Sequence, residues 1–190
     1  MSANELRAVA RQRLSGQWGN AVVVSLIFVV INGLLSTTGF GLFLLGGPLA
    51  VGLASVFLSL NRSGCADAEN LLDGIRINVV SSIVAYILQA FYIFLWSLLF
   101  VIPGIVKSYS YAMTYYILRD NPGISASEAI GRSRLMMRGH KLELFFLQLS
   151  FLGWILLSIL TCGIGFLLVR PYMQTAQAAF YDRVRGACNC

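Results

Sequence analysis

Long apolar stretches alternate with short polar ones along almost the whole chain. Six apolar segments stand out, at residues 21–35, 40–60, 78–101, 105–118, 142–160 and 164–181. Most of them approach the roughly 20 residues that an α-helix needs to cross about 30 Å of hydrocarbon. The pattern therefore predicts an all-α polytopic membrane helical bundle, with about six transmembrane helices in a single integral membrane domain over residues 1–190.

The connections between these segments alternate in character. Residues 36–39, 102–104 and 161–163 are short, uncharged and rich in Gly, Pro, Ser and Thr, which predicts tight turns. The other connections are longer and carry most of the charged residues. The positive-inside rule places these charged connections in the cytoplasm, so we expect the N-terminus and the C-terminus to be cytoplasmic as well.

A repeated unit is visible in the polar segments. Each odd-numbered apolar segment follows a short polar helix and then a glycine, which is Gly16, Gly74 or Gly139. This spacing predicts three pseudo-repeats over residues 3–62, 66–121 and 126–185, each a short cytoplasmic interfacial helix followed by a hairpin of two spans. The alternative is a chance similarity, because shared apolar composition produces comparable matches.

The polar helix before the fifth segment is the best defined of the three. Ser125 and Glu128 fit a capping box at its start. Ala126, Ala129, Ile130, Ser133, Met136 and Met137 share one face of this helix. Arg132, Arg134 and Arg138 lie off that face, which favours contact with the inner leaflet or with a partner protein.

The composition agrees with a membrane protein and disfavours a nucleic-acid-binding one. Hydrophobic residues make up 57% of the chain and charged residues only 12%, whereas ordinary soluble domains carry about 25% charged residues. The net charge of +6 is spread among short loops, as membrane topology requires, and does not form one basic surface. We therefore expect the lipid bilayer and anionic lipids as partners, and no nucleic acid.

Residues typical of enzymes are scarce. The chain has one histidine, His140, and no nucleophile elbow, phosphate-binding loop or zinc-protease motif. The C-x-C end formed by Cys188 and Cys190 is compatible with metal binding or acylation, but free thiols in a reducing compartment explain it more simply. We expect no enzymatic activity, no cofactor and no metal site.

Two cations lie within predicted spans. Lys107 and Arg170 occupy matching positions of the second and third repeats, and an ionisable residue inside a span is costly. One interpretation is a shared anion or lipid-headgroup site, completed by the neighbouring polar residues Tyr109, Tyr111, Tyr172, Gln174 and Gln177. The other is that both cations are anchors that snorkel to the membrane surface beside an aromatic belt.

The second half of the chain also carries a recognisable set of short motifs. They are IPGIVK at 102–107, YSY at 109–111, DNP at 120–122, EAI at 128–130, GHK at 139–141, GW at 153–154, PY at 171–172 and FYD at 180–182. In order and spacing they resemble a bacterial integral membrane protein family catalogued as domain of unknown function 975. The resemblance implies a multi-pass protein of the bacterial plasma membrane and implies no activity.

Two hypotheses of function follow from these observations. The first is a membrane protein that binds or transports an anionic lipid or small solute, with Lys107 and Arg170 in its site. The alternative is a structural or regulatory membrane subunit of a larger complex, which would bind its partner through the arginines of the helix that begins near Ser125.

Overall fold

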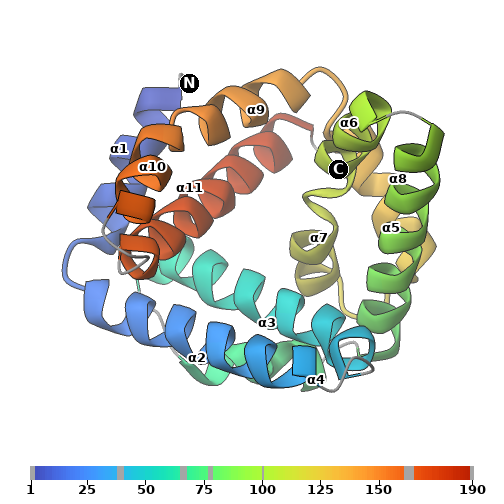
Figure 1. Cartoon of the computed structure of the whole chain (residues 1–190), viewed down its shortest axis with the longest axis horizontal. Helices are drawn as coiled ribbons and strands as arrows, with labels where there is room; N and C mark the ends of the chain where they lie inside the picture. Colours follow the sequence, from blue (N-terminus) through green and yellow to red (C-terminus); the bar gives the residue numbers. More distant parts are fainter. Residues whose placement is uncertain are drawn as a thin grey trace.

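The computed structural model of the protein describes residues 3–37, 41–64, 68–76, 79–99, 101–160 and 165–188. Every element in these residues is helical, which confirms the all-α class for the described part of the chain. In order the elements are α1 (Ala3–Leu14), α2 (Trp18–Thr37), α3 (Gly41–Ser63), the 3₁₀-helix η1 (Ala68–Leu72), α4 (Asp73–Arg76), α5 (Val79–Leu99), α6 (Val101–Tyr111), α7 (Thr114–Asp120), α8 (Ala126–Met136), α9 (Lys141–Leu149), α10 (Leu152–Leu160) and α11 (Gly165–Cys188) (Figure 1).

Three long apolar segments are suited to crossing a membrane. They are Trp18–Leu35 in α2, Val79–Leu98 in α5 and Lys141–Ile159, which covers α9 and α10. Only 17%, 17% and 22% of their residues are buried inside the protein, so most of their apolar surface faces outward. Outward apolar surface of this extent needs lipid around it, and the chain is therefore a multi-pass membrane protein in contact with the bilayer.

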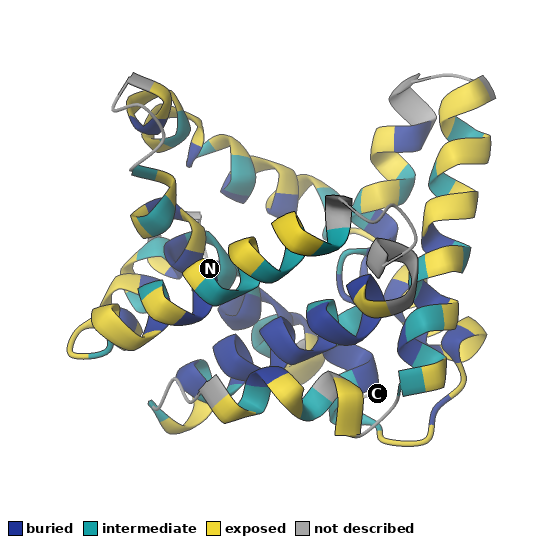
Figure 2. Ribbon diagram, turned by 60° about the horizontal axis from the view of Figure 1, so that its bottom comes forward, coloured by how far each residue is buried: buried dark blue, intermediate teal, exposed yellow. Residues whose placement is uncertain are grey.

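The buried core lies on a second set of helices. Its largest fully buried side chains include Phe57 and Leu60 of α3, Leu118 of α7 and Phe180 of α11. In Figure 2 the buried residues gather on these helices, while the long helices around them are mostly exposed. The fold therefore has an inner group, α3, α7 and α11, and an outer group, α2, α5 and α9 with α10.

Two glycines of α3 let neighbouring helices approach closely. A Cβ atom added at Gly47 would lie 2.2 Å from the carbonyl oxygen of Ser82 in α5. One added at Gly52 would lie 1.9 Å from the carbonyl oxygen of Leu71 in η1. No side chain fits at such distances, so these positions let backbone pack directly against backbone, as small residues do in membrane bundles.

One contact recurs between each polar helix and the hairpin before it. The 3₁₀-helix η1 lies against Gly52 of α3. Ser133 of α8 donates a hydrogen bond of 2.9 Å to the carbonyl of Ser110 in α6. The hydroxyl of Tyr172 in α11 donates one of 3.1 Å to the carbonyl of Arg7 in α1. The last contact joins the beginning of the chain to its end, so the pattern closes into a ring.

The three contact residues have the same spacing in sequence from a charged residue. Gly52, Ser110 and Tyr172 each precede by ten residues one of the polar residues Arg62, Asp120 and Asp182. These three polar residues meet in one cluster, described below. The ring and the equal spacing agree with the predicted pseudo-repeats over 3–62, 66–121 and 126–185, which stay a prediction.

Two predicted spans are not continuous helices. The predicted span 105–118 is interrupted between Tyr111, where α6 ends, and Thr114, where α7 begins. The Tyr111 carbonyl accepts hydrogen bonds from the Thr114 hydroxyl, at 2.9 Å, and from the Gln89 side chain of α5, at 3.4 Å. Polar side chains thus donate hydrogen bonds to a backbone carbonyl that the interruption of the helix leaves without its usual partner.

The predicted span 142–160 is interrupted in the same way. It divides at Ser150 and Phe151, between α9 and α10. The Ser150 hydroxyl donates to the Leu147 carbonyl at 2.6 Å, and the Phe151 amide donates to the Gln148 carbonyl at 3.0 Å. Hydrophobic periodicity did not reveal either interruption, because the residues on both sides are apolar.

The predicted turn at 102–104 was wrong, because these residues form the first turn of α6. Pro103 fits there since the first amides of a helix have no intrahelical acceptor. Gly104 lets α6 approach α5, and a Cβ atom there would lie 2.4 Å from the Ser97 hydroxyl. Most of the other two predicted turns, 36–39 and 161–163, lies outside the described residues. Cys188 is the last residue of α11, and Cys190 lies outside the described residues too.

Candidate functional site

A charged cluster joins the ends of the three inner helices. The Asp120 carboxylate at the end of α7 is 3% exposed. The two terminal nitrogens of Arg62, at the end of α3, donate to its oxygens at 2.9 and 2.8 Å. From α11, the Tyr181 hydroxyl donates at 3.1 Å and Arg185 at 2.5 Å. Every side of this buried carboxylate is thus paired, as its burial requires.

Arg62 also binds a second carboxylate. Its Nη2 lies 2.7 Å and its Nε 3.1 Å from Oδ1 of Asp182 in α11. Burial alone would raise the pKa of Asp120, but the hydrogen bonds and positive charge of Arg62, with Arg185, hold that pKa below its ordinary value. The hydrogen bonds that Arg62 donates to Asp120 raise the pKa of Arg62. These contacts favour the ionised forms of Asp120 and Arg62 and join the three helix ends.

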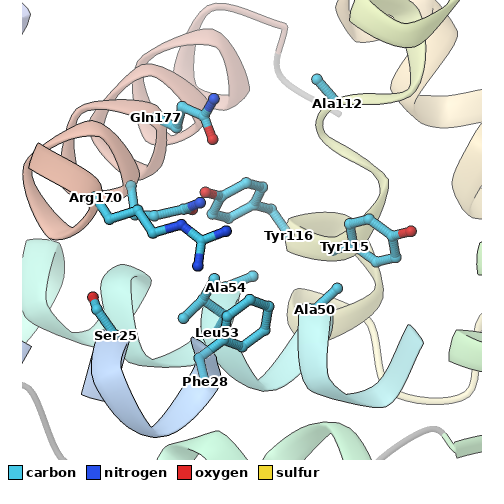
Figure 3. Close-up of a pocket in the computed structure, with 11 residues that line it drawn as sticks. Ser25, Phe28, Ala50, Leu53, Ala54, Ala112, Tyr115, Tyr116, Arg170 and Gln177 are labelled. Atoms are coloured by element: carbon cyan, nitrogen blue, oxygen red, sulfur yellow. The ribbon is translucent and has the colours of Figure 1, made fainter. Parts of the chain in front are cut away.

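A cavity of about 390 Å³ lies among α2, α3, α7 and α11 (Figure 3). Its lining residues are Ser25, Phe28, Ala50, Leu53, Ala54, Ala112, Tyr115, Tyr116, Arg170, Gln174 and Gln177. The volume falls within the range of small-molecule sites, and the lining is mostly apolar with a few polar groups, as such sites usually are. It contains one cation and no carboxylate.

Arg170 is the only charged residue of this lining. Figure 3 shows its side chain reaching into the cavity from α11. Its guanidinium carbon lies 5.7 Å from the centre of the Phe28 ring, and in the described part of the chain no carboxylate pairs with it. Gln174 and Gln177 follow on the same face of α11, at helical spacing. Together they present hydrogen-bond donors and one positive charge, which suits an anion.

Arg170 lies beside the middle of a candidate span. Its neighbours Ser25 and Phe28 are seven and ten residues past Trp18, where α2 begins. At 1.5 Å per residue this is roughly 10–15 Å along the helix, well inside the hydrocarbon if α2 crosses the membrane. A cation at the bilayer centre costs about 2.5–3.5 kcal/mol on insertion scales, so such residues usually serve a function.

A pair of stacked tyrosines separates this cavity from a second one. Tyr116 of the cavity lining stacks on Tyr181, with ring centres 5.2 Å apart and an angle of 22°. Tyr181 also lines the second hollow, of about 350 Å³, with Ile117, Asn121, Arg132, Leu135, Met136 and Arg185. The tyrosine pair therefore links the lining of the Arg170 cavity to the charged cluster at the ends of the inner helices.

The structure does not bring Lys107 to the Arg170 cavity. The Lys107 ammonium lies over the ring of Trp96 in α5, 4.5 Å from its centre. A cation over an indole face is a stabilising arrangement by itself. The two cations that occupy matching sequence positions thus have separate environments, each against an aromatic ring.

The predicted tyrosines likewise lie outside the cavity lining. The Tyr109 hydroxyl donates to the Gln148 side chain at 2.7 Å, which joins α6 to α9. Tyr111 is buried against Tyr92, with ring centres 6.2 Å apart. Tyr172 holds α1 through the hydrogen bond described above. Of the predicted anion-site residues, the cavity therefore unites Arg170, Gln174 and Gln177.

Sequence reasoning missed the rest of the lining. Ser25, Phe28, Tyr115 and Tyr116 come from α2 and α7, and none of them stands out by type or spacing. Phe28 and Tyr116 resemble ordinary core aromatics in a chain with 12% aromatic residues. Only the packing of α2 and α7 around α11 shows that they surround the cation.

The helix α8 has the features predicted for it. The Ser125 hydroxyl accepts a hydrogen bond from the Glu128 amide at 3.3 Å, as a capping box requires. All six residues of the predicted apolar face are buried, and Arg132, Arg134 and Arg138 are exposed. Arg132 pairs with Glu128 at 2.9 Å, one turn away. The buried face packs against the protein, and Arg134 and Arg138 are exposed at the surface beside the Arg132–Glu128 pair.

Comparison with known proteins places the chain in a family. The model of the family described as Protein of unknown function (DUF975) matches it in two segments, residues 1–110 and 98–188. The chain belongs to this family. Two matches along one DUF975 chain hint at an internal repeat. No curated protein and no solved structure matches the chain.

Proposed function

We propose that this DUF975 protein is a non-enzymatic membrane protein that binds or transports an anionic lipid or small solute. The observation that carries the proposal is Arg170, an exposed cation that lines a cavity beside a candidate span and has no carboxylate partner among the described residues. A structural anchor at the membrane surface would not need a cavity with two further amide side chains. An anion would offset the charge and accept hydrogen bonds from Gln174 and Gln177.

The proposed topology is six spans in the plasma membrane of a bacterium, with both termini in the cytoplasm. The basic connections support it through the positive-inside rule. Labelling with a membrane-impermeant thiol reagent tests it, using a single cysteine at the exposed position Ser127 after the four native cysteines are replaced by serine. We expect labelling only after the cells are broken. Labelling of intact cells would place α8 outside and contradict the topology.

Separate variants of the two cations test the binding proposal. We expect native mass spectrometry of the gently extracted protein to find a bound anionic molecule that is lost in Arg170→Leu and kept in Lys107→Leu. The physical reason is that Arg170 lines the cavity, whereas Lys107 lies on Trp96. Equal retention by both variants would contradict the proposal, provided that their melting temperatures match that of the natural protein.

The second candidate function is a structural or regulatory subunit of a larger complex. It is favoured by α8 and the turn after it, where Arg132, Arg134 and Arg138 are exposed beside the large exposed side chain of Leu135. Replacing the three arginines by glutamine should then release a stoichiometric protein partner. A purification that recovers no such partner from native membranes would count against this function.

A further inference from the structure

A further hollow lies next to the Arg170 cavity. This lateral hollow, of about 350 Å³, is lined by Ser25, Val29, Phe166, Leu167 and Arg170. It shares Ser25 and Arg170 with the cavity. Arg170 therefore lines both spaces, between α2 and the first turns of α11.

The two spaces differ in chemistry. The cavity has the amides of Gln174 and Gln177, whereas the lateral hollow adds only Val29, Phe166 and Leu167, which are all apolar. Neither lining contains a carboxylate. A ligand that fills both would carry an anionic group at Arg170 and a hydrocarbon part beyond it.

The lateral hollow also faces the surface that lipid covers. Val29 is 41% exposed and lies within the candidate span Trp18–Leu35, and Phe166 is 39% exposed on α11. On the opposite side of the cavity, Tyr116 is stacked on Tyr181 beside the charged cluster. The side between α2 and α11 is therefore the route that an apolar chain can take without leaving the bilayer.

We infer that the ligand of Arg170 is an amphiphile with an anionic phosphate head group, which enters from the bilayer between α2 and α11. Its head group binds Arg170 and the two glutamines, and its acyl chain lies in the lateral hollow. This inference rests on the proposed function and narrows it, because it excludes a small soluble anion as the ligand. Binding of the head group at this depth is what a protein needs in order to move a lipid between leaflets.

The test compares a lipid with a soluble glycerol phosphate that shares part of its head group. The full-length protein in detergent is titrated with phosphatidylglycerol and, separately, with glycerol 3-phosphate. Val29→Trp fills the lateral hollow from an exposed position, and Val30→Trp is its control, since Val30 is 50% exposed on the same helix and does not line the hollow. Arg170→Leu removes the cation, and Arg76→Leu is the control at an exposed cation of α4.

We expect phosphatidylglycerol to bind the natural protein and both controls. Its affinity should fall about tenfold or more in Val29→Trp and in Arg170→Leu, and an equal concentration of glycerol 3-phosphate should not displace it. Binding of glycerol 3-phosphate that depends on Arg170 and ignores Val29→Trp would overturn the inference while the proposed function stands. Binding of both probes that ignores Arg170→Leu would overturn both.

Discussion

At the residue scale the clearest feature is Asp120, a carboxylate that is almost fully buried and yet fully paired. Four side chains donate to it or lie against it, from α3, α7 and α11. A buried ion pair adds little stability compared with an apolar pair, but removing one partner leaves the others uncompensated. The net contribution of Asp120 to stability is thus small, but its loss would leave the charges of the surrounding arginines uncompensated.

Replacing Asp120 by asparagine should lower the free energy of unfolding by about 2 kcal/mol, since it leaves the charges of Arg62 and Arg185 without their shared partner. The loss is moderate because both arginines reach solvent. Denaturant titration in mixed micelles measures it. Glu69→Gln, at an exposed residue of η1, is the control and should change stability by less than about 0.5 kcal/mol. Equal stability of the two variants would show that the cluster does not hold the helix ends.

At the element scale, glycines have two distinct roles. Gly16 and Gly139, which follow α1 and α8, have φ angles of +91° and +83°, so they end these helices in a conformation that other residues rarely adopt. Gly47 and Gly52 have ordinary backbone angles and are needed for space. The sequence places glycines at both kinds of position, and the structure separates the roles.

A pair of glycine-to-alanine variants tests this separation. Gly52→Ala should lower the free energy of unfolding by about 1–3 kcal/mol, because its methyl group would meet the Leu71 carbonyl and push η1 from α3. Gly131→Ala, inside α8 with no atom within 4 Å of the added carbon, should be neutral or stabilising by up to about 1 kcal/mol. Thermal unfolding followed by circular dichroism measures both. A stable Gly52→Ala protein would contradict the backbone contact.

At the scale of the whole molecule, α1 closes the ring. Leu6, Ala10 and Leu14 are buried, and α1 lies beside α11 in Figure 1 although the two are at opposite ends of the chain. The carbonyl of Arg7 accepts a hydrogen bond from Tyr172, and its guanidinium lies over the ring of Phe151. The first helix is therefore part of the core and also supports the part of α11 that carries Arg170.

Ala10→Trp should separate α1 from α11, because Ala10 is fully buried and has no room for an indole ring. We expect a loss of about 1–3 kcal/mol in the free energy of unfolding and weaker retention of the anionic ligand. Arg13→Trp, at an exposed position of the same helix, is the matched control. Size-exclusion chromatography and thermal unfolding measure the effect. Normal stability of Ala10→Trp would mean that α1 contributes nothing to ring closure.

Local chemistry determined several features from the sequence alone. The apolar segments predicted helices and a membrane location, because both depend on the composition of one contiguous stretch. The capping box at Ser125 and the buried face of α8 follow from residues within a few positions of one another. Gln174 and Gln177 could be associated with Arg170 for the same reason, since helical spacing places them on one face.

Only the tertiary structure decided which distant residues meet. Arg62 donates hydrogen bonds to Asp120 and Asp182, which are 58 and 120 positions away in sequence, and Arg170 lies against the ring of Phe28. The matching sequence positions of Lys107 and Arg170 predicted a shared site. In the structure the Lys107 ammonium instead lies over the ring of Trp96, outside the Arg170 cavity. Such contacts depend on how helices cross, and the crossings are set by backbone packing at residues such as Gly52, which hydrophobic periodicity does not reveal.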